Sequence, residues 1–398
     1  MNPPNPLLKV AIVSTHPPGK GTLTEYGFYL LQHFRKNPNI KEVVLITDKL
    51  PNGESYHFET EGCPIQVHEV WSFNGWMNLW NILKTVRQTK PDIVLFNIQF
   101  LTFGDKKIPA ALGLMAPFFL KITSKKSVVL LHNILEQVDL KTAGITTNPV
   151  LSALYNFIGT MLTKFVLSAD LVVVTIAKYV EILEQKYQID NVALIPHGSF
   201  EIPPMPNFNL PTGPKQVMTF GKFGTYKKVE AVIDAVEIIR KRSKIALQIV
   251  IAGTDNPNKK GYLDGVKNQY KDVKDIIFTG YVAEEDVPSI FNDSAVVVFP
   301  YTSTTGSSGV LHQAGSYGKA VILPNIGDLG ELIREEGYAG EFFEPDDAQS
   351  LADAIQKVVE NDDYRRELSL KNYYAAVSLP MADIVDWYYL HFLKILGK

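Results

Sequence analysis

The chain of 398 residues is long enough for two folded domains, and its 46% content of hydrophobic residues can supply two cores. Its 39 basic and 42 acidic residues give a net charge of -3, which excludes a bulk attraction to nucleic acid and favours a small or neutral partner. The single cysteine, Cys63, excludes an intramolecular disulfide and a cysteine-based metal site, as is usual in a reducing cytosol. The polar, proline-rich start MNPPNPLLKV lacks the pattern of a signal peptide, so we expect a cytoplasmic protein.

Apolar runs of strand length alternate with helical patterns through the first half of the chain. The first run, Leu8 to Ser14, ends in the loop THPPGKG before a helical pattern that starts near Thr22. Its glycines, Gly19 and Gly21, do not form a G-x-G-x-x-G fingerprint and are better suited to letting the backbone approach a ligand. Further strand-like runs cover residues 42–47, 92–98, 127–131, 171–175 and 192–196. This alternation predicts a parallel, doubly wound sheet.

A proline-rich stretch separates this half from a second one of the same kind. Six prolines fall between Pro196 and Pro214, where neither a helix nor a central strand can form. Strand-like runs then resume at 216–220, 247–252, 276–279, 295–299 and 320–323. Ligands of such sheets bind beyond the carboxyl ends of the strands, so we expect the site in a cleft between two domains. The predicted parts are an N-terminal Rossmann-like domain over 1–200, a linker over 201–215, a second Rossmann-like domain over 216–378 and a C-terminal helix over 379–398 that packs back on the first domain.

Residues 301–310 are nearly all hydroxyl residues and glycine, and they join a valine-rich strand to a helical pattern. Such a loop offers unpaired N–H groups and the positive end of a helix dipole, so it can hold a diphosphate. The simpler interpretation is an ordinary turn in which Ser307 or Ser308 caps the helix. Lys222 and the pair 227–228 follow a strand of the same half, where they can neutralise a diphosphate or remain solvated. Because cations oppose the dipole at a helix start, we favour the functional interpretation.

Polar residues also end strands of the first half. His132 and Asn133 follow a valine-leucine strand, where they would face a cleft, although a lone histidine is more often structural. Asn97 ends the neighbouring strand and has the same two interpretations, and His197 at the domain junction fits a hinge or a ligand role. The sequence contains no evident carboxylate dyad, no G-x-S-x-G and no H-E-x-x-H, so hydrolysis by those routes is unsupported.

The apolar stretch from Ile108 to Leu120 is too short to cross a bilayer and contains two prolines. We interpret it as a core helix, with contact to a membrane surface as the alternative because lysines flank it at 106, 107, 121, 125 and 126. The C-terminal stretch from Ala382 to Leu396 is also apolar, but it is short and contains Asp386 and Lys394. We expect it to be a packed helix.

Together the motifs resemble the GT-B glycosyltransferases, and within them the retaining enzymes of family 4, or glycosyl transferases group 1. The resemblance covers nearly the whole chain. It rests on PPGKG, VVLLHN and LIPHGS in the first half, and on FGKFGTYKKVEAVIDAV, IVIAGT, IIFTGYVAEEDVPSIFNDSAVVVFPY and SSGVLHQAGSYGKAVILPNIGDLGELI in the second. It implies an α/β GT-B fold with two doubly wound Rossmann-like domains facing across a cleft. It also implies retaining transfer of a hexose from a nucleotide diphosphate sugar, of the GDP-mannose or UDP-glucose type, to a hydroxyl acceptor, with no metal or other cofactor.

The same resemblance implies roles for individual residues. Lys222 and Lys227 bind the donor diphosphate and serve catalysis together with His132. The donor site comprises Gly19, Gly21, Lys222, Lys227, Thr305, Ser307, Ser308, Gly309, Val310 and Gln313. The acceptor site comprises Gly19, Lys20, His132 and Asn133.

Lys228 stands where the family usually has a glycine, and two further positions of the donor site depart from the family pattern. The family usually has two glutamates eight residues apart, the first contacting sugar hydroxyls and the second the ribose, and these positions hold Thr305 and Gln313. A neutral Gln313 can still bond a ribose, though more weakly. The departure motivates an alternative, a non-catalytic protein that binds a sugar nucleotide or a glycan on the same fold. An epimerase on this fold would need an acid/base set that the motifs lack.

The expected partners are a nucleotide sugar and a hydroxyl acceptor (a sugar, a glycoside or a lipid-linked sugar), and no nucleic acid. The lysines around residues 108–120 permit a lipid-linked acceptor and a position at the inner face of a membrane.

Overall fold

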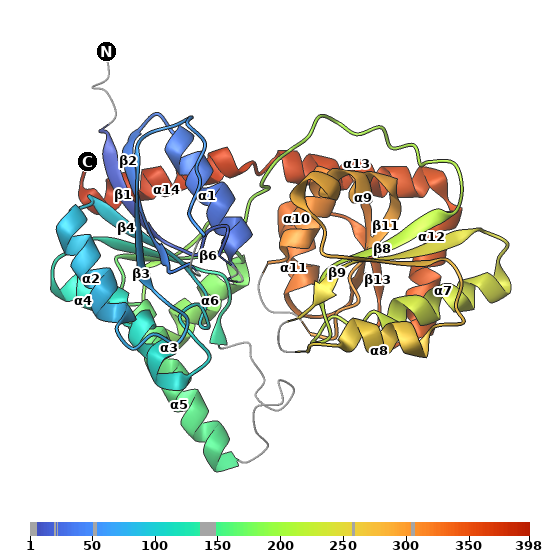
Figure 1. Ribbon diagram of the computed structural model, residues 1–398, viewed down its shortest axis with the longest axis horizontal. Coiled ribbons are helices and arrows are strands. Elements are labelled where there is room, and N and C mark those ends of the chain that lie inside the picture. The colour runs from blue at the N-terminus through green and yellow to red at the C-terminus, as the bar shows by residue number, and fades with distance from the viewer. Residues whose placement is uncertain are drawn as a thin grey trace. The chain divides into compact units, whose positions relative to one another are not determined.

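The computed structural model of the chain describes residues 6–19, 21, 23–50, 54–135, 149–256, 259–303 and 307–398 (Figure 1). The chain divides into two compact units. The first contains residues 1–197 and 381–398, and the second contains residues 198–380. The C-terminal helix therefore belongs to the first unit, and the stretch predicted as a linker, 201–215, is counted with the second.

The first unit is built on a parallel sheet whose described strands follow the order β3-β2-β1-β4-β5-β6-β7. Strands β1, β4 and β5 are buried throughout or nearly so, because valine, isoleucine and leucine pack on both faces of a helix-covered parallel sheet. The strand order reverses between β1 and β4, where open α/β sheets bind their ligands. The strands are β1 (Leu8–Val13), β2 (Ile40–Asp48), β3 (Ile65–Trp71), β4 (Ile93–Ile98), β5 (Ser127–Leu131), β6 (Leu171–Val174) and β7 (Val192–Leu194).

The helices of the first unit include α14 from the far end of the chain, which lies along α1 (Figure 1). The rings of Phe34 and Phe392 stack with centroids 5.9 Å apart, and the Asn37 amide donates to the Asp386 carboxylate at 2.7 Å. The helices are α1 (Thr24–Lys36), α2 (Asn78–Thr89), α3 (Lys107–Leu114), α4 (Ala116–Ile122), α5 (Pro149–Val166), α6 (Ala177–Tyr187) and α14 (Met381–Leu396).

The stretch predicted as one core helix, Ile108 to Leu120, forms two helices that meet at Met115. Pro117 lies in the first turn of α4, where its missing N–H costs nothing, whereas one continuous helix would lose a hydrogen bond there. The stretch is only partly core, because Leu114 and Leu120 are buried while Ile108 is exposed. Within the described ranges, no helix combines the length and the apolar character that a bilayer span requires.

The second unit repeats the architecture with the strand order β10-β9-β8-β11-β12-β13, all parallel. The order again reverses beside its central strand, between β8 and β11. Strands β3 and β13 were not predicted: both lie at sheet edges, and partly exposed residues interrupt their apolar pattern. The strands are β8 (Lys215–Phe223), β9 (Leu247–Asp255), β10 (Ile276–Gly280), β11 (Ser294–Val298), β12 (Ala320–Pro324) and β13 (Gly340–Phe343).

Helices cover both faces of this second sheet, and a continuous apolar core lies between α7, α12 and the sheet. The predicted α/β class with parallel, doubly wound sheets is confirmed in both units. The helices are α7 (Glu230–Arg242), α8 (Tyr262–Gln269), α9 (Val287–Asp293) after a 3-10 turn (Glu284–Asp286), α10 (Gly309–Ser316), α11 (Gly327–Glu336), α12 (Ala348–Glu360) and α13 (Asp362–Val377).

Candidate functional site

Two lysines stand at the carboxyl end of β8, the central strand of the second unit. Lys222 is exposed near the end of the strand. Lys227 folds back from the next loop, and its Nζ lies 4.7 Å from the ring centroid of Tyr301, a favourable position for a cation. Burial lowers the pKa of Lys227, and nearby Tyr226 opposes that shift. Neither Lys222 nor Lys227 forms an ion pair with an acid among the residues that the structure describes.

The predicted diphosphate loop leads into α10, which begins at Gly309. Ser308 occupies the N-cap position, but its side chain makes no capping hydrogen bond. The interpretation of this loop as an ordinary capped turn is therefore wrong for Ser308. The Leu311 N–H donates to the Ser308 carbonyl at 2.9 Å. The first two N–H groups of α10, those of Gly309 and Val310, have no acceptor within the helix, so they stay open to an anion. Thr305 lies outside the described residues, and Gln313 is partly exposed on the same helix without a side-chain hydrogen bond to the described residues.

Tyr301 brings the lysine and the loop together. The segments around Lys227 and Tyr301 form an antiparallel bridge, in which the Lys228 N–H donates to the Pro300 carbonyl at 2.9 Å and the Thr302 N–H donates to the Tyr226 carbonyl at 2.8 Å. Burial raises the pKa of the Tyr301 phenol, and the neighbouring Ser308 side chain opposes that rise. The ring thus contacts Lys227 while its hydroxyl end lies near the start of α10. Sequence reasoning missed Tyr301.

The Ser307 side chain points instead to a buried histidine. Its Oγ lies 2.9 Å from His312 Nε2, and His312 Nδ1 lies 3.0 Å from the Tyr338 hydroxyl and 3.5 Å from a carboxylate oxygen of Glu336. When Tyr338 donates to Nδ1, His312 donates through Nε2 to Ser307, and the Ser307 hydroxyl hydrogen remains free for a ligand. This chain of contacts fixes the loop to α11 and to the segment that follows it.

Glu336 gives this network a testable pH dependence. Burial, with a smaller contribution from Glu335, raises the pKa of Glu336 to about 8 from the ordinary value of 4.5. The unfolded chain releases this proton near pH 4.5 and the folded chain keeps it to about pH 8, so the protein loses stability as the pH rises between these values. Glu336→Gln removes that loss. Thermal denaturation measures the difference in melting temperature between the variant and wild type at each pH. We expect this difference to be roughly 2–4 °C more favourable to the variant at pH 8 than at pH 5.

The matched control is Glu285→Gln at an exposed position, for which the difference should not depend on pH. A variant that loses stability at pH 8 would contradict the neutral carboxyl and would indicate an ion pair between Glu336 and His312.

The first unit has its own polar cluster where β1, β4 and β5 end. The Asn97 amide donates to Ser14 Oγ at 2.9 Å, so its oxygen faces His132 Nε2 at 2.6 Å and accepts from it. This arrangement places the His132 proton on Nε2 and leaves Nδ1 as a hydrogen-bond acceptor. Burial, reinforced by the nearby His197, lowers the pKa of His132 to about 3.

Aromatic rings fix His132 in place. The ring of Tyr26 packs edge-on against His132 and His197, at centroid distances of 4.6 and 4.7 Å. The Tyr26 hydroxyl donates to the His197 carbonyl at 3.2 Å. A neutral His132 with so low a pKa is a weak base, and it is better suited to hold a hydroxyl than to remove its proton. Beside it, the side-chain oxygen of Asn133 is buried without a hydrogen bond to the described residues.

The predicted glycine loop lies tightly against the ends of β1 and β2. A Cβ on Gly19 would lie 2.8 Å from the His16 carbonyl oxygen, and one on Gly21 would lie 2.5 Å from Thr15 Cγ2. Both positions therefore exclude larger residues by close approach of the chain itself, a reason independent of any ligand. Lys20 lies outside the described residues.

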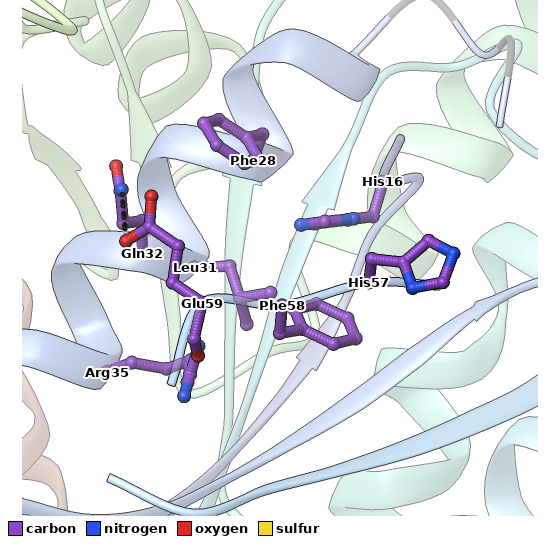
Figure 2. Close-up of a pocket in the computed structure, with 8 residues that line it drawn as sticks. All are labelled: His16, Phe28, Leu31, Gln32, Arg35, His57, Phe58 and Glu59. Carbon is purple, nitrogen blue, oxygen red and sulfur yellow. Dashed lines mark hydrogen bonds between the residues drawn. The ribbon is translucent and has the colours of Figure 1, made fainter. Parts of the chain in front are cut away.

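A small pocket near this loop is lined by side chains that contact one another (Figure 2). The His16 ring lies among Phe28 and Phe58, and burial lowers its pKa to about 4. Arg35 donates to the Glu59 and Cys63 carbonyls, and Gln32 donates to the Glu59 carboxylate at 3.2 Å. These bonds fix the segment 57–63 to α1, so we assign no ligand to the pocket. Among the described residues, no group of three or more His, Cys, Asp or Glu side chains gathers as a metal site.

Comparison with known proteins bears on both units. Residues 214–361 match the family model of glycosyl transferases group 1. Over 98% of its length the chain superposes on 99% of sucrose-phosphate synthase from Thermosynechococcus elongatus, with a TM-score of 0.71 and 16% identity. Over 98% of its length it also superposes on 99% of Anabaena HepE in complex with UDP-glucose, with a TM-score of 0.64 and 16% identity. The chain has the GT-B fold.

The GT-B fold predicted from the motifs is thereby confirmed, and the match to the glycosyl transferases group 1 model lies within the second unit. A curated relative, the O-antigen chain mannosyltransferase C of Escherichia coli, is 24% identical over 209 residues. That match covers 50% of this chain and 54% of the relative, so the chain spans about half the length of the curated protein it matches. Lys222, Lys227, Tyr301 and the 307–310 segment all lie within the matched domain.

Proposed function

We propose that the chain is a retaining, metal-independent hexosyltransferase of family 4 that uses a nucleotide diphosphate sugar of the GDP-mannose or UDP-glucose type. The observation that carries the proposal is Lys227, a partly buried cation without an acid partner among the described residues, near the open start of α10. Burial of a cation without a negative partner is unfavourable, and a bound diphosphate would supply the missing negative charge. The names of relatives support the donor class: one is a mannosyltransferase, and another was solved with UDP-glucose.

In the proposed step, an acceptor hydroxyl oxygen bonds to C1 of the donor sugar while the bond from C1 to the leaving phosphate oxygen breaks. The acceptor proton passes to the leaving diphosphate on the same face of the sugar, which retains the anomeric configuration. Lys222, Lys227 and the N–H groups of residues 307–310 stabilise the charge that develops on the diphosphate. Gln313 bonds the ribose, and Thr305 serves the sugar.

On the acceptor side, we propose that His132 accepts a hydrogen bond from a hydroxyl through Nδ1, while Asn133 and the loop from Gly19 to Gly21 complete the site. The low pKa makes His132 a weak base for the acceptor proton, which is consistent with transfer of that proton to the diphosphate. We place the enzyme in the cytoplasm, with a sugar, a glycoside or a lipid-linked sugar as the acceptor.

The test is transfer from a panel of UDP-, GDP- and ADP-sugars to hydroxyl acceptors, followed by release of the nucleoside diphosphate. We expect turnover with one donor class, no change on adding EDTA, and a product with the anomeric configuration of the donor by NMR. An inverted product would overturn retention, and loss of activity in EDTA would overturn metal independence. Tight nucleotide binding without turnover across the acceptor panel would instead identify a binding protein.

A further inference from the structure

We propose that the first unit binds the surface of an anionic lipid bilayer through an exposed apolar patch, independently of its proposed transferase activity. The patch consists of Phe73, Trp76, Met77, Trp80, Leu101 and Ile108, and we call it the aromatic patch. Each of these residues exposes between 50% and 61% of its surface. Large exposed apolar surfaces are unfavourable in water, and tryptophan in particular favours the boundary between lipid and water.

The patch is one surface because two loops are fixed to each other beneath it. Asn74, next to Phe73, donates its backbone N–H to the Phe103 carbonyl at 2.8 Å, and its side chain donates to Asp105 at 2.7 Å. The side-chain oxygen of Asn74 accepts from the N–H groups of Asp105 and Lys106 at 3.0 and 2.9 Å. The loop before α2 is therefore held against the loop before α3, so the exposed side chains of both loops belong to one surface.

Helix α2 shows why the patch is not part of the core. Its buried side chains include Leu79, Ile82 and Val86, which pack towards the sheet. Trp80, Lys84 and Arg87 recur in α2 at spacings of four and three residues, so they share another face of the helix, and Trp76 lies in the turn just before the helix begins. That face is exposed, with its aromatic residues at one end and its basic residues at the other.

The charge of the residues around the aromatic patch indicates which kind of partner binds there. Residues 70–91 and 99–126 contain eight lysines and arginines but a single acid, Asp105, in a chain whose net charge is -3. Helices α2, α3 and α4, which carry many of these residues, contact one another. Basic side chains beside interfacial aromatic residues match anionic headgroups. A symmetric contact with a second copy would instead bring two such basic surfaces together, which is unfavourable.

The patch differs from the stretch in which the sequence suggested membrane contact. Most of the apolar side chains between residues 108 and 120 are buried or half-buried, and Ile108 is the exposed one that joins the patch. The aromatic residues that dominate the patch come from the loop before α2 and from α2 itself. The lysines of that earlier stretch contribute the charge.

The experiment uses the full chain and vesicles of phosphatidylcholine, with or without an equal share of phosphatidylglycerol. We expect flotation with the anionic vesicles that weakens at high salt, and much weaker flotation with neutral ones. Trp76→Ser with Trp80→Ser should weaken binding to anionic vesicles at least tenfold. Lys84→Glu with Arg87→Glu should weaken it to the level of the neutral vesicles. Trp387→Ser, which removes a partly exposed tryptophan of α14 outside the patch, is the matched control and should bind as wild type.

Brominated acyl chains provide a second measurement, because they report contact of tryptophan with lipid directly in the wild-type protein. The protein has four tryptophans, of which Trp71 is buried. Lipid contact should quench the fluorescence of wild type and of Trp387→Ser, but not that of the Trp76, Trp80 double variant. Absence of binding to anionic vesicles, or equal binding and quenching in the double variant, would overturn the proposal. A dimer that the double variant abolishes, without lipid binding, would assign the patch to a second copy and also overturn it.

Discussion

Replacing Lys227 by methionine is expected to weaken nucleoside diphosphate binding by about 10- to 100-fold and to raise the melting temperature by roughly a few degrees. The ammonium of Lys227 is held against the Tyr301 ring, and burial lowers its pKa. In the free protein this desolvated charge is unfavourable, and methionine keeps the apolar length of the side chain without the charge. With a diphosphate bound, the same charge becomes half of a charge-assisted contact. Binding and stability should therefore change in opposite directions.

Calorimetric titration with UDP and GDP measures the affinity, and thermal denaturation without ligand measures the stability. Lys228→Met is the matched control, because the Lys228 ammonium lies 5.6 Å from the centroid of a different ring, that of Tyr262. Lys222→Ala should weaken binding with little change in stability, since Lys222 is exposed. If Lys227→Met binds as tightly as wild type, the diphosphate assignment is wrong; if it only loses stability, Lys227 has a structural role.

The central strands of both sheets could be predicted because their burial on both faces leaves a continuous apolar run. The edge strands β7 and β10 were predicted as well, but β3 and β13 were not, since polar and partly exposed residues interrupt their apolar runs. Pro117 indicates the break between α3 and α4, but the continuous apolar run around it favoured the prediction of a single helix. The positions of these strands and of the helix break therefore depend on packing against neighbouring elements, which the local sequence pattern does not show.

The candidate site was partly predictable for a similar reason. Lys222 and His132 follow strands directly, and the rule that ligands bind at carboxyl ends of strands points to both. Their partners depend on contacts across the sheet: β4 and β5 are neighbours, so Asn97 reaches His132, and the bridge at Tyr301 joins loops far apart in the sequence. No local motif marks such pairs.

The aromatic patch shows a further limit of sequence patterns. The sequence of α2 contains several apolar residues, and the sequence alone does not distinguish Trp80 from those that enter the core. Only the orientation of α2 on the sheet shows that Leu79 and Ile82 are buried while Trp80 is exposed. Composition therefore could not distinguish a buried aromatic face from an interaction surface.

Gly253→Ala is expected to lower the free energy of unfolding by about 3 kcal/mol or more and to remove nucleotide binding. Gly253 in β9 pairs with Gly221 in β8, one residue before Lys222. Its φ is +138°, a conformation that alanine rarely adopts, and an added Cβ would lie 1.9 Å from the Gly221 carbonyl oxygen. The two strands would have to separate at the point where β8 presents its lysines. Strain and site geometry therefore change together.

Urea denaturation gives the stability, and titration with UDP and GDP gives the affinity of any variant that still folds. The control is Gly265→Ala in α8, where an added Cβ meets no atom within 4 Å. Alanine in a helix interior is more favourable than glycine, so this variant should gain about 0.5–1 kcal/mol and bind as wild type. If Gly253→Ala loses stability but binds UDP or GDP with unchanged affinity, the end of β8 is not part of the nucleotide site. Equal stability of Gly253→Ala and wild type would contradict the close approach of the two strands.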